Sequence, residues 1–132
     1  MKLRNVTLAA LATSALLVGA GPAQAAGWDA VGNSTFSYRD VNLSLWFTGY
    51  VYSTGGDFQA CVGRHNDSYT HQYSLWEHDD TGSKKVATKS GKQGDCFIFR
   101  DIGAYVDGSN NKAEFFLGSN DPEGGYEVTF WD

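Results

Sequence analysis

Residues 69–82 of the chain read YTHQYSLWEHDDTG, and this stretch indicates the fold class. Two sets of side chains alternate along it: Tyr69, His71, Tyr73 and Leu75 in one, and Thr70, Gln72, Ser74 and Trp76 in the other. A period of two is typical of a β-strand with one face toward a core. The Asp-Asp-Thr-Gly that follows at 79–82 predicts a hairpin turn, because Gly adopts a positive φ and Asp side chains bond back to the backbone.

Similar alternation recurs on both sides of this stretch, and no window of a dozen residues has the spacing of an amphipathic helix. The candidate strands are residues 35–38, 41–47, 49–53, 58–64, 69–76, 85–89, 96–101, 113–118 and 126–131. Clusters of Gly, Asn, Asp and Ser separate them at roughly ten-residue spacing. We therefore predict an all-β fold over residues 35–132, a single small β-sandwich of about eight antiparallel strands.

The first 25 residues have the three parts of an export signal. Lys2 and Arg4 supply the positive charge, residues 6–20 are apolar, and Ala23-Gln24-Ala25 is a small-x-small cleavage site. The apolar part is about 15 residues long, whereas a membrane span needs roughly 20. We therefore expect residues 1–25 to be a signal peptide, and the rest to be secreted to the extracellular space without a membrane span.

Cys61 and Cys96 are the only cysteines of the chain. In the oxidising environment outside a cell, an isolated pair in one small domain is expected to form a disulfide. Residues 59–63, QACVG, resemble the caspase pattern around its nucleophile, but the fourth position is Val and no His precedes Cys61. We therefore interpret the pair as one structural disulfide.

Residues 26–34, AGWDAVGNS, lack the alternation of the later sequence. We predict a flexible N-terminal arm, in which Trp28 and Val31 could contact a partner protein when the arm becomes ordered. The final candidate strand ends next to the end of the sequence, so it too could lie at a sheet edge.

Trp46, Trp76 and Trp131 lie at the opposite strand parity from the aliphatic residues beside them. Either some of these side chains are exposed, or both faces of a sheet are covered. Exposed tryptophans on a sandwich indicate a binding surface for a protein or for a sugar. Together with Trp28 and Val31, these three form our candidate partner-binding set.

The charge of the chain is acidic, with 10 Lys and Arg against 15 Asp and Glu, a net charge of −5. Without Lys2 and Arg4 of the predicted signal the balance is 8 against 15, a net charge of −7. Phosphate contacts need a basic surface, so we expect no nucleic-acid partner. The acidic surface is either a solvated face or a docking surface for a basic protein.

The sequence contains no recognised hydrolytic motif, and we predict a non-catalytic protein without a cofactor or metal. His71 and His78 have opposite strand parity, so they cannot share one ion without a bulge. Residues 107–111, DGSNN, are rich in oxygen but lack the spaced acids of an EF-hand, so we predict a turn. A ribonuclease-like set made of Glu77 and His78 with Arg64 or Arg100 is kept as an alternative.

In size, export signal and all-β pattern, residues 26–132 resemble the small secreted adaptor components of actinobacterial umbrella-type toxin particles. The Ala-rich signal likewise resembles those of actinobacterial secreted proteins, which implies a bacterial source. The resemblance implies an adaptor that joins a lectin subunit to a large toxin subunit. We therefore predict a secreted protein-binding module. Two alternatives remain: a carbohydrate-binding protein or inhibitor of a secreted hydrolase, and a small secreted ribonuclease or other hydrolase.

Overall fold

The computed structural model describes residues 27–132, and the predicted signal peptide lies outside them. Over this range the chain forms ten short strands and one short 3₁₀ turn, η1 (Ile102–Tyr105). The strands are β1 (Ala30–Thr35), β2 (Tyr38–Asp40), β3 (Leu45–Phe47), β4 (Val51–Ser53), β5 (Phe58–Val62), β6 (His71–Glu77), β7 (Lys84–Gly91), β8 (Cys96–Phe99), β9 (Ala113–Ser119) and β10 (Glu127–Trp131).

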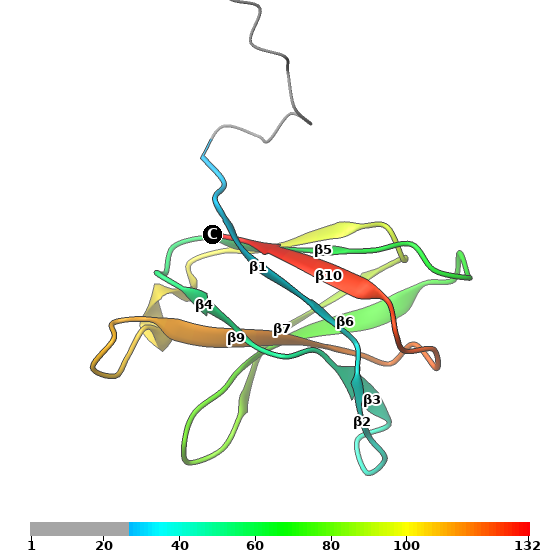
Figure 1. The fold of residues 1–132 in the computed structure, drawn as a ribbon, viewed down its shortest axis with the longest axis horizontal. Coiled ribbons are helices and arrows are strands. Elements are labelled where there is room, and N and C mark those ends of the chain that lie inside the picture. The colour runs from blue at the N-terminus through cyan, green and yellow to red at the C-terminus, as the bar shows by residue number, and fades with distance from the viewer. Residues whose placement is uncertain (1–26) are drawn as a thin grey trace, which may run out of the picture.

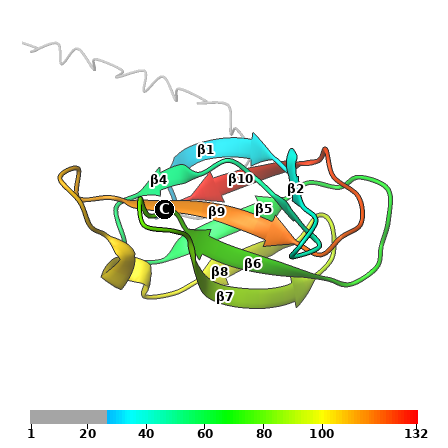
Figure 2. The ribbon, with the colours of Figure 1, turned by 90° about the horizontal axis from the view of Figure 1, so that it is seen from below.

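The strands form two antiparallel sheets that lie one against the other (Figure 1). The four-stranded sheet has the order β1-β10-β5-β8. The six-stranded sheet has the order β2-β3-β9-β6-β7, and β4 pairs with β9 as well. In Figure 2, β9, β6 and β7 run side by side across this second sheet. The predicted all-β, antiparallel sandwich is confirmed.

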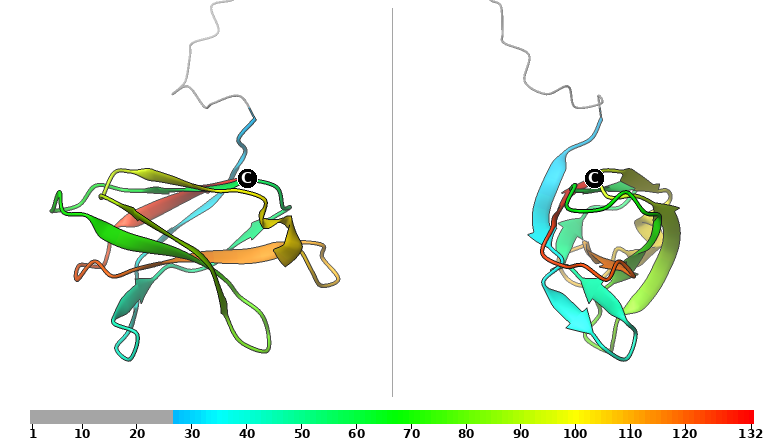
Figure 3. Two further views of the ribbon diagram at one scale, coloured as in Figure 1. Left: turned by 180° about the vertical axis from the view of Figure 1, so that it is seen from behind. Right: turned by 90° about the vertical axis from the view of Figure 1, so that its right-hand side faces the viewer.

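Side chains from the facing sides of both sheets fill one core. Phe58 and Phe130 come from the four-stranded sheet, and Leu75, Phe115 and Leu117 from the six-stranded sheet. All five are fully buried, and burying such a side chain contributes about 1.5–3 kcal/mol. Seen end-on, the two sheets curve around this core (Figure 3). The period-two pattern of the sequence therefore corresponds to alternation between the core and the outside.

The predicted disulfide is confirmed. Cys61 on β5 lies directly opposite Cys96 on β8, with their Cα atoms 3.9 Å apart, and the two sulfur atoms are bonded. Both strands belong to the same sheet, so the bond links neighbouring strands and does not join the two layers. The cross-link closes a loop of 35 residues, which restricts the unfolded chain by roughly 4 kcal/mol.

The predicted flexible arm is wrong for most of its length. Residues 30–35 form β1, which pairs antiparallel with β10, so this segment is the edge strand of the four-stranded sheet. The backbones of Asp29 and Asp132 extend the pairing through two hydrogen bonds of 2.9 Å. Gly32 allows β1 to pass close to β4, because a Cβ there would lie 3.0 Å from Val51 Cγ1. β10, for which an edge position was possible, lies between β1 and β5.

The predicted strand over residues 41–47 is also wrong in its first half. Residues 41–44 form the turn between β2 and β3, in which Ser44 has a φ of 54°. Asp40 Oδ1 accepts hydrogen bonds from the amides of Asn42 and Leu43, each at 2.9 Å. The alternating Val41 and Leu43 therefore lie at an exposed hairpin tip. A side chain that bonds its own backbone can favour a turn over a strand.

Candidate functional site

The five predicted partner-binding residues are not brought together. Trp28, Val31 and Trp131 lie in or beside the pairing of β1 with β10, whereas Trp46 and Trp76 belong to the six-stranded sheet. All five side chains are partly buried. Val31 and Trp46 pack against the core cluster. The structure thus separates the set into two groups on different sheets.

Trp46 covers one end of the core. Its Nε1 donates a hydrogen bond of 3.2 Å to the Pro122 carbonyl, and its ring lies against Gly124, where a Cβ would come within 2.7 Å. Arg39 lies over the ring, with its Cζ 5.8 Å from the ring centroid. Trp46 is therefore held by packing on several sides. This packing explains why Trp46 has the opposite strand parity from its aliphatic neighbours, and no exposed binding face is needed.

Trp76, by contrast, lies on the outer face of the six-stranded sheet. Its ring packs with Phe47 at 5.5 Å and with Phe116 at 6.3 Å between centroids. Gly118 leaves the space for this packing, because a Cβ there would lie 2.6 Å from Phe47 Cε1. Lys85 Nζ lies 5.3 Å from the centroid of the Trp76 ring. Both faces of this sheet therefore carry apolar side chains.

These rings form the floor of an open hollow of about 390 Å³, here called the aromatic hollow. Its apolar lining residues are Tyr38, Leu43, Phe47, Tyr50, Trp76 and Phe116. The β2–β3 and β6–β7 hairpins project to the same side of the sheet (Figure 1). Residues of both hairpins line the hollow. At the tip of the β2–β3 hairpin, Val41 is 75% exposed and Leu43 53%. Exposed apolar side chains, Tyr38, Leu43 and Tyr50, thus belong to the lining of a hollow that is itself largely apolar.

A second hollow, of about 460 Å³, adjoins the aromatic hollow and shares Tyr50 and His78 with it. The two shared rings are stacked, with 5.1 Å between their centroids and 5° between their planes. The second hollow is lined by acidic and polar side chains and is called the acidic hollow: Asp79, Asp80, Asp107, Ser109, Asn110 and Glu114. The apolar and the acidic surfaces are therefore continuous across one aromatic pair.

One buried carboxyl group lies beside the acidic hollow. Glu77, at the end of β6, is 3% exposed, and its Oε1 has no hydrogen-bond partner within the described part of the chain. Carboxylate oxygens of Glu77, Asp107 and Glu114 lie within 4.8 Å of one another, and these three residues are called the Glu77 cluster. Burial and then the charges of Asp107 and Asp79 raise the pKa of Glu77 above its usual value.

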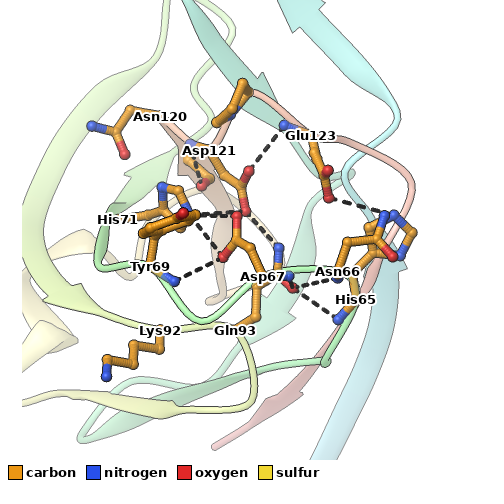
Figure 4. Close-up of polar contacts among 12 residues, drawn as sticks. His65, Asn66, Asp67, Tyr69, His71, Lys92, Gln93, Asn120, Asp121 and Glu123 are labelled. Atoms are coloured by element: carbon orange, nitrogen blue, oxygen red, sulfur yellow. Dashed lines mark hydrogen bonds and ion pairs between the residues drawn. The ribbon is translucent and has the colours of Figure 1, made fainter.

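A different polar group fills the other end of β6 and is shown in Figure 4. Asp121 is 1% exposed, and its Oδ2 accepts hydrogen bonds from Gln93 Nε2 at 2.7 Å and from the Tyr126 hydroxyl at 2.9 Å. His71 Nε2 lies 3.5 Å from the same oxygen and 3.0 Å from Asp67 Oδ2. These five residues are called the Asp121 network.

The Asp121 network joins three loops to the start of β6. Gln93 uses its Oε1 to accept hydrogen bonds from the amides of His65 and Asn66, at 2.8 and 3.0 Å, while its Nε2 donates to Asp121. Asp121 Oδ1 accepts from the amide of Glu123 at 2.9 Å. Both oxygens of the buried carboxylate are thus satisfied, which offsets the cost of its burial.

The hydrogen bonds also set the charge state of Asp121. Burial acts to raise its pKa, but the hydrogen bonds from Gln93, the Glu123 amide and Tyr126 outweigh burial. Together with the nearby His71, they hold the pKa of Asp121 below its usual value. Burial in turn raises the pKa of Tyr126, which stays a hydrogen-bond donor. The arrangement fits a fixed anionic centre that holds loops in place.

The residues of the ribonuclease-like alternative do not converge. Glu77 is buried, whereas the neighbouring His78 stacks on Tyr50 in the wall of both hollows. Arg100 is paired with Asp57, with Nη1 2.6 Å from Oδ2. Arg64 lies against Gly94, in the turn between β7 and β8. The geometry therefore does not bring these groups around a common reacting atom.

Sequence reasoning missed both polar groups. The members of the Asp121 network come from loops and strands spread over residues 67–126, and no spacing rule connects them. Glu77 did carry a signal, because it shares the parity of Tyr73 and Leu75 and continues their inward-facing row. The predicted turn at 107–111 is confirmed, since Asp107 pairs with Lys112 and Asn111 has a φ of 52°.

Comparison with known proteins gives two matches. A family profile described as "YndA coiled coil domain" matches residues 30–130. The uncharacterized protein YndA of Bacillus subtilis (strain 168) is 39% identical over 116 residues, which are 86% of this chain and 80% of that protein. No solved structure matches the chain.

The coiled coil of the profile's description has no counterpart in residues 27–132, whose one helical element is the four-residue η1. Within the same residues, no helix has the length and apolar character to cross a membrane.

Proposed function

This chain belongs to the YndA family, and we propose that it is a secreted, non-catalytic binding protein whose aromatic hollow receives an apolar side chain of a partner protein. The observation that carries the proposal is the exposed apolar rim of this hollow. Two large side chains of this rim contact solvent and do not belong to the buried core: Tyr38 is 62% exposed and Leu43 is 53% exposed. Contiguous apolar surface of this kind is a common property of interaction sites.

The chemistry of the partner follows from the neighbouring acidic hollow. Asp79, Asp80 and Glu114 lie just beyond the shared Tyr50 and His78 pair, and the whole chain carries a net charge of −5. A protein segment that places Lys or Arg next to a large apolar side chain would match both surfaces at once. The apolar part would supply most of the affinity, and the charges would favour association and orientation.

An adaptor subunit of an extracellular, toxin-type complex is the form of this function favoured by the resemblance in size, export signal and all-β pattern. A sugar ligand is the competing form, because stacked rings beside carboxylates and amides also suit carbohydrates. The protein partner fits the hollow better, since Leu43, Phe47 and Phe116 offer few hydrogen-bonding groups to a hydroxylated ligand.

A site-specific crosslinking experiment tests the proposal. A photoreactive phenylalanine analogue replaces Leu43 or Tyr50 in the protein made by its native producer. The matched control position is Tyr69, which is 74% exposed but belongs to the loop before β6, beside the Asp121 network. We expect one discrete protein adduct from positions 43 and 50 and none from position 69.

The identity of the adduct decides the outcome. Support requires that the crosslinked peptide contains an apolar residue flanked by Lys or Arg, and that raising the salt concentration lowers the crosslinking yield. An absence of adducts, or equal adducts from position 69, would overturn the proposal. Specific glycan binding that is lost in Trp76→Ala would replace the protein partner with a sugar.

A further inference from the structure

The Glu77 cluster combines features that the partner-binding proposal does not use. Three carboxylate groups from separate segments meet within 4.8 Å: Glu77 from the end of β6, Glu114 from β9, and Asp107 from the turn before β9. Like charges at this separation repel one another, so bringing them together is unfavourable unless a cation or a proton compensates. Asp107 and Glu114 line the acidic hollow, which gives an ion a route from solvent.

The second observation concerns the buried oxygen of Glu77. This residue is 3% exposed, yet its Oε1 has no hydrogen-bond partner within residues 27–132. An unsatisfied buried carboxylate oxygen is costly, and such groups are rare in folded proteins. The neighbouring Lys84 forms an ion pair with Asp79, with its Nζ 4.0 Å from Oδ2, and its charge offsets only part of the repulsion, because the pKa of Glu77 is still raised.

The surrounding backbone fixes the geometry of the cluster. The amide of His78 donates a hydrogen bond of 2.8 Å to the carbonyl of Glu114, which joins the end of β6 to the start of β9. The backbones of Asp107 and Lys112 form a β-bridge across the turn. Asn110 Nδ2 donates a hydrogen bond of 3.2 Å to Glu114 Oε1. The carboxylates therefore project from a hairpin turn and two paired strands, which limits how far they can move apart.

We propose that Glu77, Asp107 and Glu114 bind a divalent cation of the calcium type at the edge of the acidic hollow. An all-oxygen ligand set suits a hard cation, and Ca²⁺ completes its six to eight ligands with water and carbonyl or amide oxygens. A charge of +2 reduces the charge of the three carboxylates from −3 to −1. From the sequence we expected no metal. The sequence did not predict this site because residues 107–111 supply only one of its ligands, and strands β6 and β9 supply the other two.

The Asp121 network is the weaker candidate for a metal, although Asp67, His71 and Asp121 also lie within 4.8 Å of one another. There His71 Nε2 is already hydrogen-bonded to Asp67, and both Asp121 oxygens accept hydrogen bonds. An ion at that end would have to displace existing bonds. An ion at the Glu77 cluster would instead give a partner to Glu77 Oε1, which has no hydrogen bond.

Calorimetric titration of the purified, chelator-treated protein with CaCl₂ tests the proposal. We expect binding with a dissociation constant of about 10⁻⁴–10⁻³ M, the range of extracellular calcium modules. Glu77→Gln and Glu114→Gln should each weaken binding about tenfold or more, because each removes one charged ligand. The matched control is Asp80→Asn, which removes a carboxylate from the same hollow but not from the cluster, and should change binding by less than about twofold.

A thermal melt with and without CaCl₂ separates loss of binding from loss of fold. Ca²⁺ should raise the melting temperature of the wild type and of Asp80→Asn, and should not raise that of Glu77→Gln or Glu114→Gln, which still unfold cooperatively. No binding by the wild type up to about 10 mM would overturn the proposal. So would equal weakening by Asp80→Asn, which indicates diffuse charge, or loss of binding in Asp67→Asn, which places the ion in the other cluster.

Discussion

The two ends of β6 each bury a carboxyl group, and they treat it in opposite ways. At the start of the strand, Asp121 accepts hydrogen bonds from three donors and has a lowered pKa. At the end of the strand, Glu77 has an oxygen without a partner, two acidic neighbours and a raised pKa. The Asp121 carboxylate therefore has its partners within the protein, whereas the Glu77 carboxylate lacks one at Oε1, and this difference is the basis of the proposed cation site.

Other features of the molecule follow the same division. The Asp121 end consists of loops held together by side chains, with Gln93 at their centre. The Glu77 end borders the acidic hollow and, through Tyr50 and His78, the aromatic hollow with its two projecting hairpins. Both proposals, the partner protein and the cation, therefore concern the same end of the sandwich.

The largest effect should come from removing the satisfied carboxylate. Asp121→Ala leaves the buried donors of Gln93 and Tyr126 without their acceptor, and we expect it to lower the free energy of unfolding by about 3 kcal/mol. Denaturant unfolding measures this change. A loss below about 0.5 kcal/mol would mean that the Asp121 network does not hold the loops together.

The corresponding change at the other end should have the opposite sign. Glu77→Gln removes a buried charge that has like charges beside it, so we expect the free energy of unfolding, measured in chelator, to rise by about 1 kcal/mol. The same denaturant experiment applies. A decrease of more than about 1 kcal/mol would show that Glu77 already has a favourable partner in the protein, and the contrast between the two ends would fail.

The pH dependence of stability should differ between the two ends. The folded pKa of Asp121 lies below its usual 3.8, so its contribution is complete above that value and is lost as the pH falls through the folded pKa. The folded pKa of Glu77 lies above its usual 4.5, so stability decreases as the pH rises from 4.5 through the folded pKa.

Unfolding curves measured across this range test both signs. We expect Asp121→Asn to flatten the acid limb of the wild-type profile, and Glu77→Gln to remove the decrease that begins near pH 4.5. Profiles that are unchanged in both variants would mean that neither carboxyl group has a shifted pKa.

The sequence was sufficient for the features that depend on local patterns. The alternation over residues 69–76 predicted β6, the turn residues at 79–82 predicted the β6–β7 hairpin, and the two cysteines predicted their bond. Each of these depends on neighbouring residues or on a single possible pairing. The same holds for the turn at 107–111.

Features that depend on tertiary context were not predictable in the same way. β1 has no alternating pattern, because an edge strand is held mainly by backbone hydrogen bonds to β10. Residues 41–44 alternate like a strand, but the Asp40 carboxylate bonds the backbone into a turn. The Asp121 network joins segments that are remote in sequence, so only the folded chain brings it together. Trp46 and Trp76 both have the opposite strand parity from their aliphatic neighbours. In the folded chain, however, Trp46 covers the core, whereas Trp76 lines the aromatic hollow.

One measurement compares the two ends directly: the ¹H–¹⁵N correlation spectrum of the labelled protein during titration with CaCl₂. We predict shifts at the amides of Glu77, Asp107 and Glu114 and their neighbours around the acidic hollow, with the amides of Asp67, His71 and Asp121 unchanged. Shifts confined to the Asp121 network, or a spectrum that does not change, would contradict the claim that the Glu77 end is the ligand-binding end of this protein.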